Sequence, residues 1–284
     1  MAGWSRRGLK RLVAVGCCLV LAMALMAGAS AAGDGRRPSI DITRTSLRVL
    51  QMNLCNSGIA GCYTGRSVAE AAAVIRAERP DVITLNEVCA EDVSVLDRAL
   101  SDAYRGGTVV SAFEAAVDRR TGDAVRCRNG QRFGDGLLVR VRQPYRGYTT
   151  HGAAYSAQDT ADPEERVWLC LHAIDRFYAC TTHLASTSPT VALRQCRYLL
   201  GTAIPALRTH DGSGPVVLGA DLNLTSGRTP DVRSCVPAGF VRTDDGARQH
   251  IVASADFTVT SSRSINMRGT TDHPGLLADL STIT

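Results

Sequence analysis

The stretch PVVLGADLNLTSG, residues 215–227, joins a run of apolar residues to a carboxylate and an amide. The apolar run at 216–218 is typical of a strand that is buried on both faces. Asp221 and Asn223 follow it two residues apart, and in a strand such residues point to the same face. Both residue types also favour turns, so this stretch alone leaves a turn and a polar site open as alternatives.

The start of the sequence has the features of an export signal. Basic residues without an acid precede an apolar segment at 12–27, and small residues at 29–31 fit a cleavage site. The Arg6-Arg7 pair also resembles a twin-arginine signal. The apolar segment is short for a membrane span, so we favour export over a retained anchor. The expected parts are a signal peptide at 1–31, an N-terminal tail at 32–46 and a single domain at 47–284.

The composition is that of a globular protein with little net charge after this signal. The whole chain has 32 Lys and Arg against 27 Asp and Glu, and four of the basic residues lie in the signal, so +5 becomes about +1. Such a balance gives no global field that would indicate nucleic acid as a partner. The segment 119–146 is nevertheless rich in arginine, which fits either a nucleic-acid contact or a solvated surface.

Of the ten cysteines, eight follow the signal, and an even number in an exported chain indicates disulfides. Their spacing is not that of a zinc site. A predicted hairpin with the turn 174–176 places Cys170 directly opposite Cys180, and Cys55–Cys62 is a second candidate bridge.

Strands and helices are mixed along the rest of the chain, which predicts one α/β domain with two helical layers. Besides the hairpin and the opening strand, we expect strands at 47–54, 81–88, 108–113, 136–141, 250–254, 256–261 and 275–281. We expect helices at 67–78, 91–100 and 188–208, and a loop at 143–166.

Several of these strands end in polar residues, which are Asn53, Glu87, His183, the Asp221/Asn223 pair and the Asp272-His273 pair. Each residue alone is more simply explained as a turn residue, an exposed acid or a satisfied structural histidine. Their recurrence at one edge of the predicted sheets favours a shared site instead.

The motifs QMNL, LNEV, FGDGLLVR, TTHLAS, GADLNL and TDHPGLL occur in this order between residues 47 and 280. In order and spacing they resemble the endonuclease/exonuclease/phosphatase superfamily, here as an exported bacterial-type member. The resemblance implies a deoxyribonuclease-like, four-layered α/β/β/α sandwich with two mixed β-sheets. It also implies a metal-dependent phosphodiester hydrolase, and a nuclease is the interpretation we favour. A lipid phosphodiesterase or phosphatase (sphingomyelinase-like) and a catalytically weakened secreted binding protein remain open.

The resemblance also assigns roles to individual residues. Those roles are catalysis for His183, Asp221 and His273, phosphate binding for Asn223 and Arg166, and metal binding for Glu87, Asn53 and Asp272. A surface position is an equally good explanation for Arg166. Mg²⁺ or Mn²⁺ is the expected cofactor, because hard cations take carboxylate oxygens and lower the barrier to attack on an anionic phosphodiester. A structural Ca²⁺ is compatible with the family, but no residue pattern identifies one.

One position departs from the family pattern. The family places an Asp in the strand before the final motif, where it pairs with the last histidine, whereas RQHIVAS has Gln249 there. An amide can hydrogen-bond an imidazole but carries no charge, and loss of an orienting carboxylate can cost orders of magnitude in rate. Asp244, Asp245 and Asp256 are the nearby acids that could take its place.

We therefore expect a secreted monomer with nucleic acid as its substrate and no stable membrane association after signal removal. The loop 142–165 offers three tyrosines but no Trp or Phe, which disfavours insertion into a membrane. The sequence does not distinguish DNA from RNA or endonuclease from exonuclease action.

Overall fold

The structure is a computed structural model and describes residues 46–104 and 108–282. The predicted signal peptide, and the predicted tail up to residue 45, lie outside the described residues.

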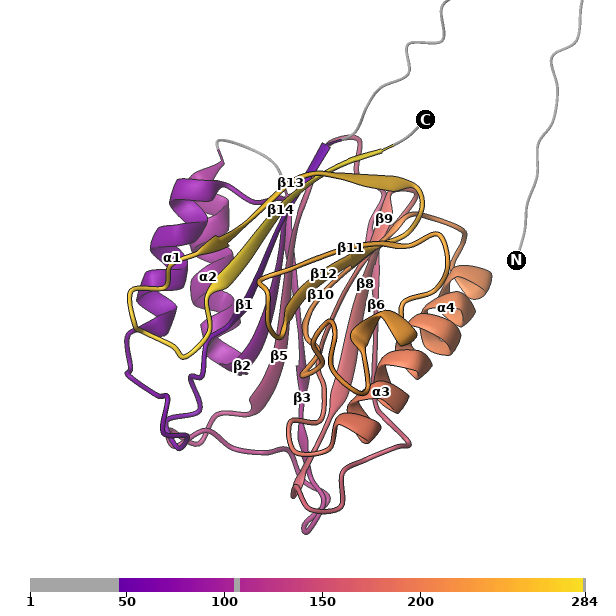
Figure 1. The fold of residues 1–284 in the computed structure, drawn as a ribbon. Coiled ribbons are helices and arrows are strands. Elements are labelled where there is room, and N and C mark those ends of the chain that lie inside the picture. Colours follow the sequence, from indigo (N-terminus) through magenta and orange to yellow (C-terminus); the bar gives the residue numbers. More distant parts are fainter. Residues whose placement is uncertain (1–45, 105–107, 283–284) are drawn as a thin grey trace, which may run out of the picture. The chain divides into compact units, whose positions relative to one another are not determined.

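Two six-stranded sheets form the centre of the domain (Figure 1). The first sheet contains, in spatial order, β13 (Phe257–Ile265), β14 (Gly275–Thr282), β1 (Ser46–Asn53), β2 (Val82–Cys89), β5 (Phe133–Val141) and β3 (Thr108–Ala115). The second contains β11 (Val241–Asp244), β12 (Gln249–Ala253), β10 (Val216–Asp221), β9 (Phe177–His183), β8 (Val167–Ala173) and β6 (Tyr148–Ala154). The short strands β4 (Val117–Asp118) and β7 (Glu164–Glu165) pair separately.

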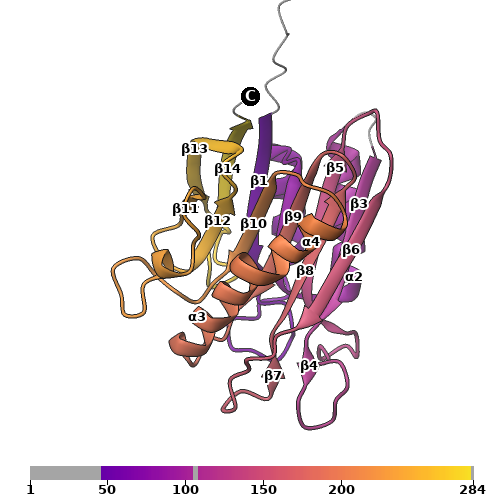
Figure 2. The same ribbon diagram turned by 90° about the vertical axis from the view of Figure 1, so that its right-hand side faces the viewer.

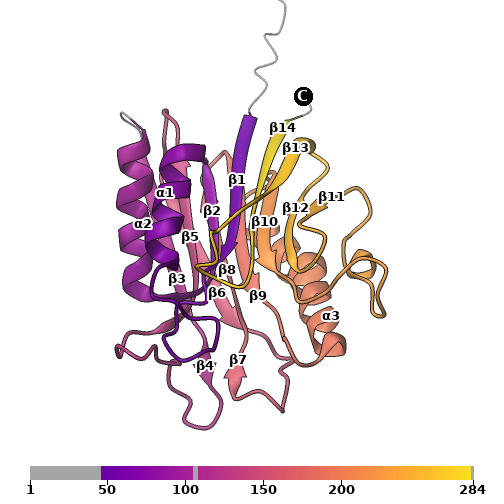
Figure 3. The ribbon, with the colours of Figure 1, turned by 60° about the vertical axis from the view of Figure 1, so that its left-hand side comes forward.

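Helices cover the outer face of each sheet. The first sheet carries α1 (Ser67–Glu78) and α2 (Ala90–Ala103), which Figure 3 shows side by side. The second carries α3 (Pro189–Tyr198), a π-helical segment η1 (Leu199–Ala203) and α4 (Ile204–His210), as Figure 2 shows. A 3₁₀ turn, η2 (Val232–Ser234), follows β10. The predicted four-layered α/β/β/α sandwich is therefore confirmed.

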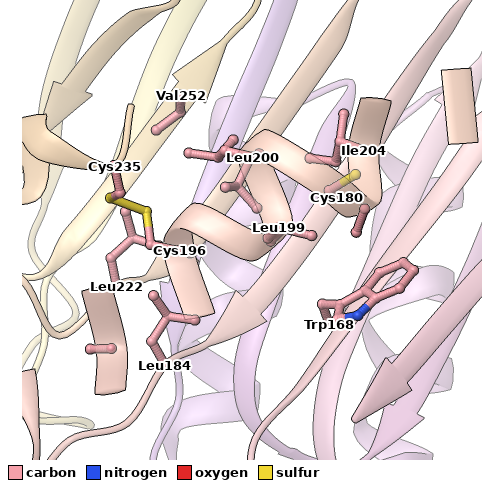
Figure 4. Packing of buried hydrophobic residues seen from close by; sticks show 14 of the residues in the cluster. Trp168, Cys180, Leu184, Cys196, Leu199, Leu200, Ile204, Leu222, Cys235 and Val252 are labelled. Carbon is pink, nitrogen blue, oxygen red and sulfur yellow. A yellow bond between two sulfur atoms is a disulfide. The ribbon is translucent and has the colours of Figure 1, made fainter. Parts of the chain in front are cut away.

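Three apolar clusters hold the four layers together, one at each interface between layers. Leu199 and Leu200 after α3 belong to one apolar cluster with Trp168, Val252 and other side chains of the second sheet (Figure 4). Ser188 caps this helix by accepting a hydrogen bond from Val191 N at 3.4 Å, and Pro189 occupies its first turn.

All eight cysteines of the described residues are bridged. The pairs are Cys55–Cys62, Cys89–Cys127, Cys170–Cys180 and Cys196–Cys235. The first and third confirm the two predicted bridges, and Cys170 lies opposite Cys180 in the strand register. Four bridges indicate an oxidising compartment. Within the described part of the chain, no helix has both the length and the apolar character needed to cross a membrane.

The prediction of a continuous loop at 143–166 was wrong. This segment contains β6, which pairs antiparallel with β8 at the edge of the second sheet, and the short strand β7. Most residues of β6 are exposed, so its sequence lacks the apolar alternation that would have revealed a strand.

The strand directions explain where a site can form. The central pairs β1–β2 and β9–β10 are each parallel, whereas the other pairings in both sheets are antiparallel. The carboxyl ends of the two parallel pairs lie at the same edge of the sandwich, since Asn53 at the end of β1 contacts Asp221 at the end of β10.

Candidate active site

Asp221 occupies the centre of this edge. In the strand register it lies between His183 at the end of β9 and Gln249 at the start of β12. From the opposite sheet, Asn53 Nδ2 donates to Asp221 Oδ2 at 3.1 Å. Burial opposes ionisation of Asp221, yet His183, His273 and the hydrogen bonds from Asn53 and Gln249 hold its pKa below the ordinary value. We infer that Asp221 is a carboxylate at neutral pH.

The stretch after β10 forms a turn that brings Asn223 next to Asp221. Asn223 lies beyond the strand with φ +49°, and its backbone N–H donates to Asp221 Oδ1 at 3.1 Å. Strand alternation therefore does not explain why the two residues lie together, and that part of the sequence argument was wrong. The Asn223 side chain donates to the Leu184 carbonyl at 2.9 Å, which fixes it beside the end of β9.

Glu87 is aimed by a bulge in β2. The pairing of β2 with β5 shifts between Leu85 and Val88, and Glu87 has φ +56°. Bulges of this kind turn a side chain out of the regular pleat, often at active sites. Asn53 Nδ2 donates to Glu87 Oε1 at 2.8 Å, and burial raises the pKa of Glu87.

Asn53 presents nitrogen rather than oxygen to the site. Its Oδ1 accepts the Cys55 backbone N–H at 3.1 Å, while Nδ2 faces both Glu87 and Asp221. As placed, the amide orients two carboxylates, and its predicted role as a metal ligand stays a prediction.

His183 is held by Arg166. The Arg166 Nη1 atom lies 2.8 Å from His183 Nδ1, and because a guanidinium can only donate, Nδ1 accepts and Nε2 carries the proton. Burial first, and then the charge of Arg166, lowers the pKa of His183 to about 3. His183 is therefore a neutral imidazole whose Nε2–H is a hydrogen-bond donor.

Arg166 itself is buried, at 5% exposure, so the alternative of a surface arginine does not hold. Its guanidinium forms ion pairs with Glu164 at 3.0 Å and Asp162 at 3.1 Å. Burial raises the pKa of Glu164 to about 7 despite this pairing.

Gln249 does not replace the expected partner of His273. Its Nε2 donates to Asp221 Oδ2 at 2.8 Å, and its Oε1 accepts from Gln51 at 3.0 Å. The carboxylates near His273 Nε2 are instead those of Asp221, at 3.6 Å, and Asp272, at 3.8 Å.

The three acids considered as substitutes contact other groups. Asp244 pairs with an arginine, Asp245 accepts the backbone N–H of Gln249, and Asp256 accepts from a serine. Asp221 is therefore the buried carboxylate available to His273, at 1% exposure.

The predicted site residues lie around a hollow at this edge of the sandwich. Seven of the eight line it, and the eighth, Asn53, lies behind Glu87 and Asp221. Glu164, Ser186 and Arg248 also line the hollow, although the sequence argument assigned them no role.

The family follows from a comparison of sequences. The profile described as Endonuclease/Exonuclease/phosphatase family matches residues 51–273. The chain belongs to this family. Members of the endonuclease/exonuclease/phosphatase family are generally phosphoester hydrolases that use a divalent metal.

Solved structures with the same fold are distant in sequence. An endonuclease/exonuclease/phosphatase from Beutenbergia cavernae DSM 12333 is 20% identical, with a TM-score of 0.62 over 84% of this chain and 72% of that one. TDP2 from D. rerio, complexed with a single-strand DNA product, is 17% identical, with a TM-score of 0.57 over 84% and 100%. ANGEL2, a 2′,3′-cyclic phosphatase, is 13% identical, with a TM-score of 0.58 over 84% and 96%. The comparison with curated proteins found no match.

The charges in the hollow fit the divalent metal of this family. Its lining includes four carboxylates, on Glu87, Glu164, Asp221 and Asp272, but only two guanidinium groups. Carboxylate oxygens are the hard ligands that Mg²⁺ and Mn²⁺ prefer, and an excess of them favours a bound cation. Glu87 and Asp272 fit the role of ligands best, because Asp221 already accepts three hydrogen bonds from protein groups.

Asp135 is a buried residue near the site that the sequence argument did not single out. Its carboxyl accepts from Asn86 Nδ2 at 2.8 Å and from the His183 backbone N–H at 3.1 Å. Burial raises the pKa of Asp135 to about 8. In the sequence, Asp135 stands out as the one acid inside the apolar strand FGDGLLVR. In the structure it accepts the backbone N–H of His183 and so supports the end of β9.

Proposed function

We propose that the protein is an exported, divalent-metal-dependent phosphodiesterase that cleaves nucleic acid. The observation that carries this proposal is the hollow in which His183, Asp221 and His273 meet Glu87 and Asp272. The resemblance of the fold to TDP2, whose structure holds a single-strand DNA product, supports nucleic acid as the substrate class. The predicted signal at 1–31 and the four disulfides support export.

The geometry suggests a division of roles around a bound phosphodiester. His183 donates from Nε2 to a phosphate oxygen, since its Nδ1 is engaged by Arg166. Asn223 has a second amide hydrogen for the same purpose, because only one is used by Leu184. The Asp221–His273 pair takes the proton of the attacking water, with the carboxylate stabilising the imidazolium that forms. A metal held by Glu87 and Asp272 would neutralise charge on the phosphate.

The two alternatives receive less support. A lipid phosphodiesterase is less well supported, because the hollow itself is lined by charged and polar residues. The alternative of a degenerate binding protein rests on Gln249, which stands where the family places the carboxylate partner of His273. In the structure Asp221 lies 3.6 Å from His273 Nε2, and Gln249 donates to Asp221, so His273 has a carboxylate beside it.

The test is hydrolysis of plasmid DNA, single-stranded DNA, RNA and sphingomyelin by the purified protein in Mg²⁺ or Mn²⁺. We expect DNA or RNA cleavage, and we expect His183→Ala and Asp221→Ala to abolish it. His210→Ala is the matched control, because His210 is exposed at the end of α4 and should leave the rate unchanged. Hydrolysis of sphingomyelin alone would support the lipid alternative, and no hydrolysis of any substrate would overturn the enzymatic proposal.

A further inference from the structure

The hollow contains two arginines whose environments differ sharply. The guanidinium of Arg166 is committed to protein groups: it pairs with Asp162 and Glu164, contacts His183 Nδ1 and lies 3.3 Å from Ser186 Oγ. A substrate phosphate would have to compete with two carboxylates for a group that is 5% exposed. Arg166 is therefore suited to positioning His183 rather than to capturing a mobile anion.

Arg248 has the opposite character. It is exposed, and within the described chain its guanidinium forms no ion pair or hydrogen bond, although it lines the hollow beside Asn223, Asp272 and His273. The positive charge of Arg248 also helps to lower the pKa of His183, which lines the same hollow. Arg248 is thus a cation at the mouth of the site without an anionic partner of its own.

The backbone around Arg248 is well fixed even though the side chain is free. The Arg248 carbonyl accepts the Leu222 N–H at 3.0 Å, just after the end of β10. The next residue, Gln249, is anchored through its backbone to Asp245 at 3.1 Å and through its side chain to Asp221. Because this backbone is fixed, the guanidinium of Arg248 can offer two parallel N–H donors to a phosphate without a backbone rearrangement.

Building on the proposed function, we infer that Arg248 binds a phosphate of the substrate, and that Arg166 is a positioning residue for His183. The ligand class is a phosphodiester strand, because the arginine lies at the exposed mouth of the hollow, next to the groups assigned to the scissile phosphate. The family resemblance implies this contact for Arg166, but Arg166 is buried and already pairs with Asp162 and Glu164.

The test compares Arg248→Ala and Arg248→Lys with Arg98→Ala. Arg98 is an exposed arginine on α2 with no ion pair among the described residues, so it controls for loss of one surface charge. The first measurement is the affinity for a fluorescent single-stranded oligonucleotide in EDTA, by anisotropy at several salt concentrations. The second is kcat and KM in Mg²⁺, and unfolding midpoints verify that each variant is folded.

We expect Arg248→Ala to weaken oligonucleotide binding by about 10-fold and to make the slope of log affinity against log salt shallower by about 0.7, the value for one phosphate contact on a single strand. KM should rise about 10-fold while kcat changes by less than about 3-fold, because uniform binding is lost. Arg248→Lys should keep the salt slope but recover only part of the affinity, because an ammonium cannot bind bidentately.

Wild-type affinity and slope in Arg248→Ala, or an equal effect of Arg98→Ala, would overturn the inference while leaving the proposed function intact. A wild-type protein that binds the oligonucleotide through Arg248 but hydrolyses nothing would instead overturn the proposed function and leave the inference standing.

Discussion

Replacing Gln249 by Asp tests the arrangement of the site, because sequence and structure lead to opposite expectations. By family resemblance, Asp at 249 restores the charged partner of the last histidine and should raise activity. In the structure, Gln249 Nε2 donates to Asp221 Oδ2 at 2.8 Å, and the carboxylate beside His273 Nε2 is that of Asp221, at 3.6 Å. An Asp at 249 would therefore set a second carboxylate against Asp221.

The cost follows from the contacts that change. A hydrogen bond to a charged acceptor, worth about 1.5–3 kcal/mol, is lost. Two like charges about 4 Å apart repel by about 4 kcal/mol at an effective dielectric constant near 20. This repulsion raises the pKa of one of the two carboxyls above its ordinary value, because a second negative charge is disfavoured beside the first. A carboxyl with a raised folded-state pKa stays protonated at acid pH, so the repulsion is small there and grows as the pH rises through neutrality.

Urea unfolding of Gln249→Asp and Gln249→Asn separates charge from length, since Asn keeps the amide but shortens the side chain equally. We expect Gln249→Asp to be less stable than Gln249→Asn by about 4 kcal/mol at pH 8, with a smaller difference at pH 5. Its catalytic rate at pH 8 should also fall below that of wild type. Equal stability of the two variants at both pH values, or a rate above wild type, would contradict a repulsion between the new carboxylate and Asp221 in the Gln249→Asp variant.

Two further predictions concern the support of the site. Burial raises the pKa of Asp135 to about 8 from an ordinary value of 3.8, so the free energy of unfolding should fall as the pH rises from about 4 to 8. Urea titrations of Asp135→Asn should show a flatter dependence of this free energy on pH between about pH 6.5 and 8. An unchanged slope would contradict the buried protonated carboxyl. A Cβ on Gly219 would lie 2.1 Å from Thr84 Oγ1 across the two sheets, so Gly219→Ala should lower the free energy of unfolding by about 1–3 kcal/mol. Gly201→Ala in η1, where nothing lies within 4 Å of the added Cβ, is the control and should be neutral or slightly stabilising.

The parts of the fold that the sequence predicted are those encoded by local patterns. Apolar runs and the residues that end them located the central strands, and with them His183, Asp221 and Glu87. The register of a short hairpin was enough to pair Cys170 with Cys180, because a three-residue turn fixes which residues face each other.

What the sequence could not predict depends on contacts between distant segments. The exposed edge strand β6 carries no apolar alternation, so only its pairing with β8 defines it. The backbone of Glu87 departs from the strand because of the bulge opposite β5, not because of its neighbours in sequence.

Electrostatic partners were equally hidden. The family pattern makes position 249 the partner of His273, whereas the strand pairing places Gln249 opposite Asp221. Nothing in the sequence indicates that Arg166 is buried in an ion pair with Glu164, and this burial is the reason we propose a positioning role for Arg166 instead of phosphate binding.

The proposed function requires that this hollow hydrolyse phosphodiesters with the help of a divalent cation. The most direct measurement is the initial rate of cleavage of a plasmid and of a single-stranded oligonucleotide in Mg²⁺, for the wild type, for the wild type in EDTA and for His183→Ala. We expect cleavage of at least one substrate by the wild type and none in EDTA. We also expect a loss of at least about 100-fold in His183→Ala, which is the lower range for removal of a positioned donor. Cleavage that survives EDTA or is unchanged in His183→Ala would contradict the proposed function.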